Sequence, residues 1–440
     1  MMISGWGRYP WQDCVVHDPR SADDLRGLIG QGPLIARGNG RGYGDCAQQP
    51  AGTVSTLRLN RMLAFDADTG LLVVEAGVLL AEVIDAFLPR GWFPPVTPGT
   101  KFVTIGGMVA ADVHGKNHHR DGAFGRFVAW FDLLDGTGEV RRCSPTSDPD
   151  LFDATIGGMG LTGVILRIAF HLQRVESGWI RQTTLPAPDL DTAMRLFEDH
   201  AEVRYSVAWI DCLAGGRSLG RSAIMLGEHA SITDLPEPLQ AAPFGTPRRK
   251  LRTLPFDAPS GLLNGLTVRA FNAAYYRRQV MKRGLQLVDW DSYFYPLDAV
   301  GQWNRIYGRR GLLQFQCALP LASARAGLIE LLEVIAKSGQ GSFLAVLKRL
   351  GGLSGGAFSF PLDGYTLALD FPVSAKTLAL MERLDAIVLA HGGRFYLAKD
   401  SRMSAATLRA SDARVPQFLA LRQAEGAGAF ASSQSERLEL

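Results

Sequence analysis

The sequence predicts an α+β protein with two domains, and three observations support this prediction. The chain has 440 residues, which is too long for one ordinary hydrophobic core. As far as residue 176, short strand-like and helix-like segments mix around several glycine loops. Residues 180–225 and 285–375 carry the alternation of an antiparallel sheet, with helical stretches between them. We therefore expect one domain at 1–176, a second at 177–392 with its sheet flanked by helices, and a C-terminal segment at 393–440.

The first domain is expected to contain short elements in mixed order. The pattern predicts helices at 20–30 and 81–92, and strands at 33–40 and 70–80. Residues 102–119 are expected to begin as a buried segment and to end in a polar loop. Residues 127–143 read as a hairpin that turns at 135–138, and 148–175 as a helix, a glycine turn and a long strand.

A central span, residues 232–261, is rich in proline and lacks periodicity. We expect a long, mobile loop over about 230–260. It contains a basic cluster at residues 248–252, with apolar Leu251, Leu254 and Phe256 interleaved. Basic and apolar residues together indicate docking on an anionic membrane, while a solvated loop is the equal alternative.

The composition argues against several classes of protein. With 47% hydrophobic and 20% charged residues the chain should be globular, and a net charge of +3 gives no general case for nucleic-acid binding. No apolar run reaches about 18 residues, and the first residues lack a signal-peptide pattern. Five scattered cysteines without a CxxC pair favour reduced thiols in the cytoplasm.

One motif resembles a dinucleotide fingerprint but has the wrong surroundings. Gly158, Gly160 and Gly163 form a literal GxGxxG. That fingerprint requires a strand before the loop and a helix after it. Here a helical pattern precedes the glycines and a strand pattern follows, so a tight helix-to-strand turn is the better interpretation.

Three other glycine loops are better candidates for a cofactor site. They cover residues 37–45, 97–107 and 111–119. Successive backbone N–H groups in such turns bind anions, and glycine lets a ligand approach closely. With Arg37, Arg41, Lys101 and Lys116 nearby, the loops predict one extended anionic ligand, such as a diphosphate cofactor, without identifying it.

A family resemblance adds to this. "RGNGRGYGD", "TPGTKFVTIGGMVAADVHGKNHH", "GGMGLTGVILR" and "FYLAKDSR", in this order, resemble flavin oxidoreductases of the vanillyl-alcohol-oxidase type, which carry a PCMH-type FAD-binding domain. The likeness extends over nearly the whole chain and is greatest to the branch that oxidises the ribose of a polyprenyl phosphate. It implies that residues 1–176 bind FAD, that 177–392 bind substrate, and that 393–440 return to the FAD domain.

The resemblance also implies which residues contact the cofactor. The pyrophosphate would lie over the first loop and over residues 104–107, Ile165 near the adenine, and Tyr43, His114 and Tyr396 toward the flavin ring. The implied set is Arg37, Gly38, Asn39, Gly40, Arg41, Gly42, Tyr43, Gly44, Asp45, Gly99, Thr104, Ile105, Gly106, Gly107, Ala111, His114, Ile165 and Tyr396. Many relatives tether flavin through a histidine where this chain has Arg41, so we expect non-covalent FAD.

Substrate contacts are expected in the second domain and the C-terminal segment. Gln314 and Gln316 alternate with apolar residues, so both amides should point to one face of a strand and could bind sugar hydroxyls. By resemblance Gln316, Lys348 and Lys399 lie in the pocket, and Lys399 beside the flavin is the first catalytic candidate. The alternatives are an exposed sheet face for the amides, a helix-end cation for Lys348 and a solvated lysine at 399.

Lysine, threonine, alanine, histidine and tyrosine side chains complete the expected site. Lys116 is a candidate for phosphate or sugar contact, against the alternative of an exposed loop cation. Thr366 and Ala368 occupy substrate-side positions where well-known members carry asparagine and cysteine. His114 is expected near the flavin as a catalytic group, together with Tyr43. The H-x3-H-H spacing of residues 114–119 is poor for a metal, and no metal is expected.

The resemblance implies oxidation of a ribose 2-hydroxyl to a 2-keto sugar, the first half of an epimerisation to arabinose in cell-envelope biosynthesis. An NADH-dependent short-chain reductase would be the functional partner, and no nucleic acid is expected. The alternatives are an alditol or aldonolactone oxidase that uses oxygen, or a scaffold without turnover. We expect a cytoplasmic protein with a possible peripheral contact to the inner membrane, and the periplasmic face stays open.

Overall fold

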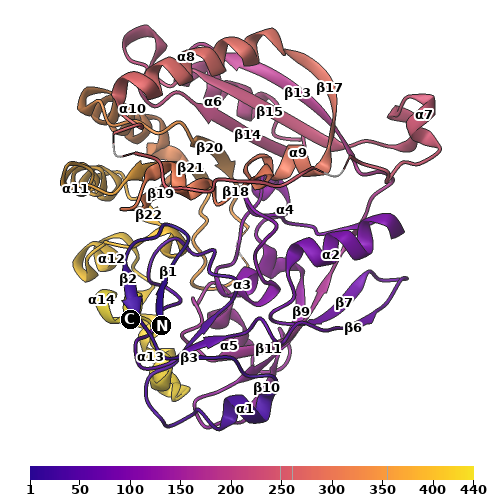
Figure 1. The fold of residues 1–440 in the computed structure, drawn as a ribbon, viewed down its shortest axis with the longest axis vertical. Helices are drawn as coiled ribbons and strands as arrows, with labels where there is room; N and C mark the ends of the chain where they lie inside the picture. The colour runs from indigo at the N-terminus through magenta and orange to yellow at the C-terminus, as the bar shows by residue number, and fades with distance from the viewer. Residues whose placement is uncertain (248, 260, 354) are drawn as a thin grey trace.

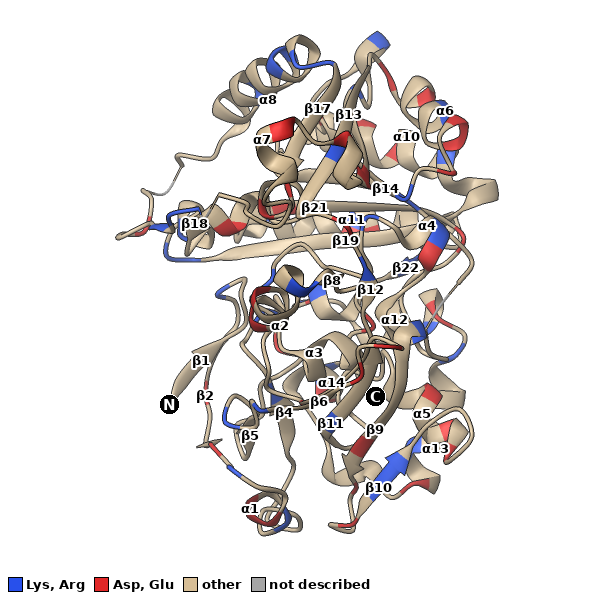
Figure 2. Ribbon diagram, turned by 90° about the vertical axis from the view of Figure 1, so that its right-hand side faces the viewer, with Lys and Arg blue, Asp and Glu red and all other residues tan. Residues whose placement is uncertain are grey.

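The structure is a computed structural model that describes residues 1–247, 249–259, 261–353 and 355–440. Arg248, part of the predicted basic cluster, therefore lies outside the described residues. The chain forms a lower body of small sheets and an upper body around one large sheet (Figure 1). The N- and C-terminal ends both lie at the lower body, where Figure 2 shows them well separated.

The lower body contains two larger sheets and two pairs of short strands, all built by the first part of the chain. A parallel sheet has the order β3-β5-β4, with bounds Val16–His17, Thr53–Ser55 and Ile35–Arg37. An antiparallel sheet has the order β10-β9-β11-β7-β6, with bounds Val140–Cys143, Val128–Leu134, Val164–His171, Leu71–Glu75 and Met62–Phe65. The shorter strands are β1 (Met2–Ser4), β2 (Trp11–Asp13), β8 (Trp92–Phe93) and β12 (Gln173–Arg174). The helices are α1 (Ala22–Arg26), α2 (Leu80–Phe87), α3 (Ile105–Ala110), α4 (His118–Asp121) and α5 (Pro149–Thr155).

Two local predictions in the lower body are confirmed. The β9–β10 hairpin turns at Asp135, whose side chain accepts hydrogen bonds from the backbone N–H groups of Thr137 (2.9 Å) and Glu139 (3.1 Å). The GxGxxG segment lies between α5 and β11, so a helix precedes it and a strand follows. Gly160 and Gly163 there have φ of 78° and 155°, a conformation that glycine readily adopts in a tight turn.

The segment 102–119 differs from its expectation, because it contains the helices α3 and α4 where a buried segment and a polar loop were expected. Thr104 caps α3 by accepting a hydrogen bond from Gly107 N–H at 3.2 Å. A Cβ on Gly106 would lie 2.8 Å from Ala76 Cβ. Glycine disfavours a helix, but here it allows α3 to approach the end of β7, and tertiary packing decides.

The upper body is an eight-stranded sheet covered by helices. Its order is β17-β13-β15-β14-β20-β21-β19-β22, with bounds Gly284–Asp289, Trp179–Ala187, Ser222–His229, Tyr205–Ile210, Ala345–Leu350, Gly364–Pro372, Leu312–Pro320 and Arg394–Phe395. The helices are α6 (Leu190–Asp199), α8 (Gly265–Met281), α9 (Trp290–Phe294), α10 (Leu321–Ser338) and α11 (Ala375–Ala390). Leu313, Phe315 and Cys317 of β19 belong to the core beneath these helices. The alternate residues of β19 therefore face the lower body.

The central span is mostly irregular, as expected, but it is not free of structure. It contains α7 (Glu237–Gln240) and β16 (Arg252–Thr253), which pairs in parallel with β18 (Val300–Gly301). Arg249 donates to the backbone carbonyls of Asp291 (3.4 Å) and Tyr295 (3.3 Å). The mobility of this span stays a prediction.

The C-terminal segment runs from the upper sheet back to the lower body (Figure 1). After β22 it forms a short 3-10 turn, η7 (Leu397–Lys399), and then α12 (Ala405–Ser411), α13 (Val415–Ala424) and α14 (Ser433–Leu438). Arg422 donates to Leu161 O at 2.9 Å, and Arg437 pairs with Asp45 at 2.8 Å. These contacts fit the expected return of the segment, although the domain limits themselves stay predictions.

Candidate active site

Two of the predicted glycine loops and the C-terminal segment meet at one place. Asn39 Nδ2 of the first loop donates to Phe102 O of the second at 2.8 Å. Tyr43 N–H donates to Ala398 O at 2.9 Å. A Cβ on Gly44 would lie 2.1 Å from Asp400 O. Segments far apart in the sequence are therefore locked together around the first loop.

The glycines of these loops serve two different purposes. A Cβ on Gly38 would meet Thr104 Oγ1 at 2.2 Å, and one on Gly42 would meet Cys46 Sγ at 2.7 Å, so these glycines are needed for packing within the protein. Gly99, in contrast, has no atom within 4 Å of an added Cβ. Only this second kind of glycine borders open space in which a ligand could lie.

The backbone of the first loop fits a diphosphate cofactor. Among the described residues, no intramolecular acceptor is found for the backbone N–H groups of Asn39, Gly40, Arg41 and Gly42. Gly40 has φ of 61°, the left-handed conformation that helps successive N–H groups to converge. The amides of α3 differ, because Ile105 and Gly106 donate to Val78 O (2.9 Å) and Ala76 O (2.8 Å). An anion would therefore find its free N–H donors in the first loop.

The charged residues of the first loop have mainly internal partners. Arg37 Nη2 donates to Ser4 O at 2.7 Å, and Asp45 pairs with Arg437. The Arg41 guanidinium lies 4.1 Å from the ring centroid of Trp6, and its buried Nε has no hydrogen-bond partner. Of these three side chains, Arg41 is the one with a buried donor that has no partner.

A cavity of about 670 Å³ opens beside the first loop. Its volume lies in the range of small-molecule sites. Arg37, Gly38 and Asn39 line it together with residues of the first strands, but Gly99, His114 and Tyr396 do not. The cavity therefore adjoins the outer side of the loop, apart from the residues expected around the flavin ring.

On the face of the upper sheet that is turned to the lower body, polar side chains of β19 and β21 form a cluster. Strand alternation predicted that Gln314 and Gln316 would share this face. Gln314 donates to Asp370, which is its register partner on β21. Gln316 Nε2 lies 3.1 Å from His114 Nε2 and donates to Thr366 Oγ1 at 3.3 Å. The amide of Gln316 thus connects the upper sheet to the third glycine loop, and the exposed-face alternative is wrong for it. Ala368 is the register partner of Gln316.

Three partly buried lysines surround this polar cluster. Lys399 Nζ lies 3.8 Å from the ring centroid of Tyr43. Lys348 lies on strand β20 opposite Thr366, so the helix-end alternative is wrong for it. Lys116 donates to Tyr293 O, and its Nζ lies 4.0 Å from the Tyr293 ring centroid.

Burial lowers the pKa of all three lysines. It lowers the pKa of Lys348 to about 8, and burial together with the charge of Lys348 lowers the pKa of Lys116 to about 7. Burial lowers the pKa of Lys399, while the nearby Asp370 carboxylate opposes this. These charged groups are costly to bury, and an anionic ligand would relieve the cost.

The three histidines turn to different partners. His114 is buried, its Nδ1 has no hydrogen-bond partner, and burial with the charge of Lys348 lowers its pKa well below the ordinary value. His118 Nδ1 accepts from Gly351 N–H at 3.2 Å, and His119 Nε2 lies 2.9 Å from Val203 O. Among the described residues, no three His, Cys, Asp or Glu side chains are placed to hold a metal ion.

Two acidic residues of the site were missed in the sequence. Asp370 is buried beneath Gln314, and burial raises its pKa. Asp112 accepts hydrogen bonds from Gly125 N–H (2.8 Å), Gly355 N–H (3.1 Å) and Ser359 Oγ (2.5 Å), and so holds the segment before Phe360. The sequence does contain a signal for them, because each acid stands within an apolar segment: Asp370 in "LALDFP" and Asp112 in "VAADVH".

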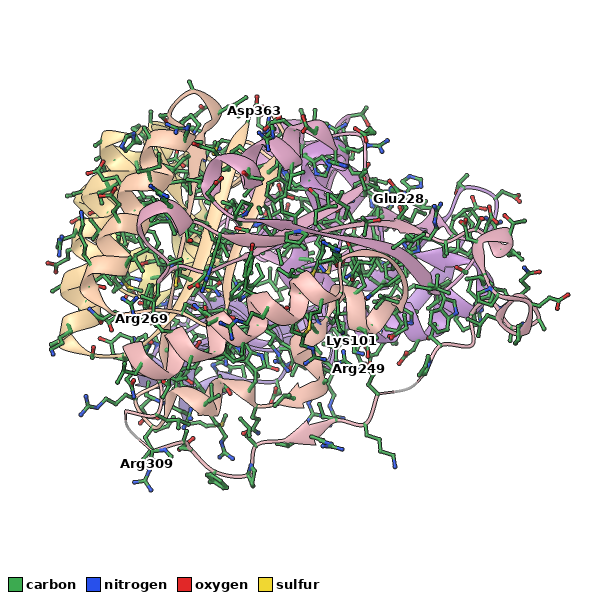
Figure 3. The ribbon with its side chains drawn as sticks, turned by 90° about the horizontal axis from the view of Figure 1, so that it is seen from above. Lys101, Glu228, Arg249, Arg269, Arg309 and Asp363 are labelled. Carbon is green, nitrogen blue, oxygen red and sulfur yellow. The ribbon has the colours of Figure 1, made fainter. Side chains whose placement is uncertain are left out.

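Other predicted residues take structural positions. Lys101 Nζ pairs with Asp291 at 2.6 Å, and Arg249, near it in Figure 3, donates to the backbone carbonyl of the same residue. Tyr396 OH donates to Ala111 O at 2.9 Å, and its ring stacks on Phe360 at 4.7 Å. Ile165 is packed in the core of the lower body.

Comparison with known proteins places these features in a family. An FAD binding domain model matches residues 16–144. The chain is 39% identical over 412 residues to decaprenylphosphoryl-β-D-ribose oxidase from Mycolicibacterium smegmatis, covering 92% of this chain and 89% of the relative. It is 35% identical to an uncharacterized Streptomyces coelicolor protein, covering 82% of this chain and all of that one. It is also 30% identical to cytokinin dehydrogenase 4 from Arabidopsis thaliana, over only 33% of this chain and 29% of that protein.

Proposed function

The chain belongs to the family of FAD-dependent oxidoreductases that includes decaprenylphosphoryl-β-D-ribose oxidase, and on this premise we propose that it oxidises the 2-hydroxyl of a polyprenyl-phosphate ribose. The product is the 2-keto sugar. One observation carries the proposal from the site itself. Partly buried lysines and the amide of Gln316 lie around Tyr43 and His114, beside a loop with free N–H groups. Cations suit the phosphate, and amides suit the sugar hydroxyls.

In this proposal the residues divide the work of binding. Lys116 and Lys348 hold the phosphate as point charges, and Gln316 orients a ribose hydroxyl. Because Gln316 also contacts Thr366 and His114, its amide has a fixed direction before the sugar binds. Gln314 is held by Asp370 and stiffens the neighbouring part of the surface.

The chemical step removes a hydride from C2 and a proton from the hydroxyl oxygen, which leaves a C2=O bond. FAD, when bound, supplies the hydride acceptor. Lys399 Nζ hydrogen-bonds the reacting oxygen and takes its proton when the amine is neutral, and its lowered pKa favours this role. The Tyr43 ring lies under this amine and fixes its position.

The decisive experiment is anaerobic. The FAD-loaded protein is mixed with ribosyl prenyl phosphate, arabinosyl prenyl phosphate or a free alditol, and the visible absorbance of the flavin is followed. We expect rapid bleaching with the ribosyl lipid. Absence of bleaching with both prenyl phosphates would overturn the proposal, and bleaching by the alditol with fast oxygen uptake would favour a soluble sugar oxidase.

We also propose that FAD is bound without a covalent link, because Arg41 stands where many relatives carry the tethering histidine. The Arg41 guanidinium stacks on Trp6, and its free Nε supplies a donor in place of a bond. Acid precipitation should release all yellow colour into the supernatant. Flavin that stays in the washed pellet would contradict this.

The proposed product requires a second enzyme. Reduction of the 2-keto sugar on the opposite face gives arabinose, and we propose a separate NADH-dependent short-chain reductase as functional partner. We further propose that the protein meets its lipid substrate as a peripheral protein at a membrane surface. In the part of the chain that the structure describes, no helix is both long and apolar enough to cross a bilayer.

A further inference from the structure

Large apolar side chains are exposed on one stretch of the upper body. Leu266 is 80% exposed, Met281 78% and Phe256 68%. The full set, called the α8 face below, is Leu251, Phe256, Leu262, Leu266, Phe271 and Met281. Large exposed side chains of this kind, when concentrated, mark a surface that is covered in use.

Helix α8 carries much of this face and is anchored from its inner side. Asn272 Nδ2 donates to Asp211 Oδ1 at 2.7 Å, and Tyr276 OH donates to Ala187 O at 3.3 Å. With 3.6 residues per turn, the opposite side presents Leu266, Ala270, Ala274, Arg277 and Met281. The outward side of the helix therefore exposes Leu266 and Met281 beside Arg277, with small alanines between them.

The same stretch is strongly basic. Residues 249–283 contain eight Lys or Arg and a single acidic residue, Asp257, although the whole chain has a net charge of only +3. Asp257 is already paired with Arg8 at 2.5 Å. Figure 2 shows basic residues on α8 and near β18 on the same side of the molecule. Figure 3 shows Arg309 on this side too.

An aromatic chain joins the α8 face to the candidate site. Phe271 packs edge-on against Phe343, with ring centroids 5.6 Å apart, and Phe343 stacks on Tyr307 at 5.8 Å. Tyr307 shares an apolar cluster with Tyr43, whose ring lies under Lys399. The face and the site thus form one continuous region of the molecule.

We propose that the α8 face docks on an anionic lipid bilayer, with Leu266, Phe256 and Met281 inserted among the lipids and the basic residues at the headgroups. The link to a lipid substrate rests on the proposed function, but the docking stands on the face alone. A second copy of the chain is disfavoured, because a two-fold contact would oppose two basic surfaces. Nucleic acid would leave the apolar side chains without a partner.

The test is co-sedimentation of the FAD-loaded full chain with vesicles of phosphatidylcholine alone or mixed with phosphatidylglycerol. We expect binding to the mixed vesicles that weakens with salt. Arg277→Gln/Arg278→Gln should lower partitioning about tenfold or more, and Leu266→Gln/Met281→Gln should do the same. The matched control is Met62→Gln/Leu63→Gln, an exposed apolar pair on β6, which should bind like the wild type.

The outcomes separate the docking from the catalytic proposal. Wild-type binding to mixed vesicles, lost in both α8 pairs with FAD content unchanged, supports docking even if no prenyl-phosphate sugar bleaches the flavin. Equal binding by wild type and α8 pairs, no binding to mixed vesicles, or stronger binding to duplex DNA than to vesicles would each overturn it. Self-association that both α8 pairs abolish, without vesicle binding, would assign the face to a second copy instead.

Discussion

Lys399 is the residue on which the proposed chemistry depends. Its ammonium lies over Tyr43, and burial lowers its pKa. We expect Lys399→Met to slow flavin bleaching by the ribosyl lipid about 100-fold or more while FAD stays bound. Lys337→Met, at an exposed lysine paired with Glu333, is the control. A bleaching rate within a few-fold of wild type, measured by anaerobic stopped flow, would remove Lys399 from the catalytic role.

The lysines of the phosphate site make a prediction about pH. Burial lowers the pKa of Lys116 to about 7 and of Lys348 to about 8, so both lose charge as the pH rises through these values. A phosphodiester keeps its single negative charge throughout. Its affinity should therefore fall about tenfold or more between about pH 6 and about pH 9.

Tryptophan quenching by a prenyl phosphodiester measures this affinity without turnover. In Lys348→Met the affinity for the phosphodiester should vary less with pH. One titrating cation is gone, and the pKa of Lys116 rises toward its ordinary value. An affinity that is flat across this range in the wild type would show that the lysines do not hold the phosphate.

At the residue scale, the sequence predicted which way side chains point better than it predicted which residues they contact. Strand alternation placed Gln314 and Gln316 on one face, and the structure agrees. Asp370 and Asp112 were missed because their roles depend on register and on loops that meet only in the fold. Arg37 was expected to serve a phosphate, yet its guanidinium binds Ser4 O, a contact that no spacing reveals.

At the scale of elements, the glycine loops make a paired prediction. Gly44→Ala would force a Cβ against Asp400 O, whereas Gly99→Ala would enter open space. We expect Gly44→Ala to destabilise the FAD-free protein by about 1–3 kcal/mol. Gly99→Ala should leave that stability unchanged and weaken FAD binding.

Thermal unfolding of the FAD-free protein and a titration with FAD separate the two effects. If Gly99→Ala binds FAD with wild-type affinity, the flavin does not lie against this loop. If Gly44→Ala melts like the wild type, the backbone at Asp400 can move away from the first loop without loss of stability.

Elements were predictable where local signals agree with the fold. The β9–β10 hairpin has a turn residue and alternation, and both point to the same structure. Helix α3 lacks such agreement, because Gly106 and Gly107 oppose a helix locally. Its reason to form is the close contact with Ala76, which lies far away in sequence.

At the scale of the whole molecule, Arg437 of α14 holds two buried carboxylates. It lies 2.8 Å from Asp45 and 2.9 Å from Asp400. We expect Arg437→Met to destabilise the protein by about 3–5 kcal/mol, because both carboxylates lose their countercharge. Arg409→Met, at an exposed pair with Glu439, should have little effect.

The same variant should change how stability depends on pH. Although burial raises it, Arg437 and nearby N–H groups hold the pKa of Asp400 below its ordinary value. Its stabilisation is therefore present above the unfolded pKa and is lost as the pH falls through the folded one. In Arg437→Met both carboxylates lose their countercharge, so burial raises their pKa and they take up protons as the pH falls from neutral toward about 4. The deficit should therefore be largest near neutral pH and shrink over this range. Urea unfolding with an equal deficit at both pH values would contradict this.

The meeting of the first loop with the end of the chain also has a consequence for biosynthesis. Residues 37–45 leave the ribosome early, but Ala398, Asp400 and Arg437, which fix that loop, emerge more than 350 residues later. A nascent chain stalled before Arg437 should therefore fail to retain flavin, however well its earlier part has folded. Cofactor loading would then report that translation has passed Arg437, and unloaded chains would be the ones exposed to proteases.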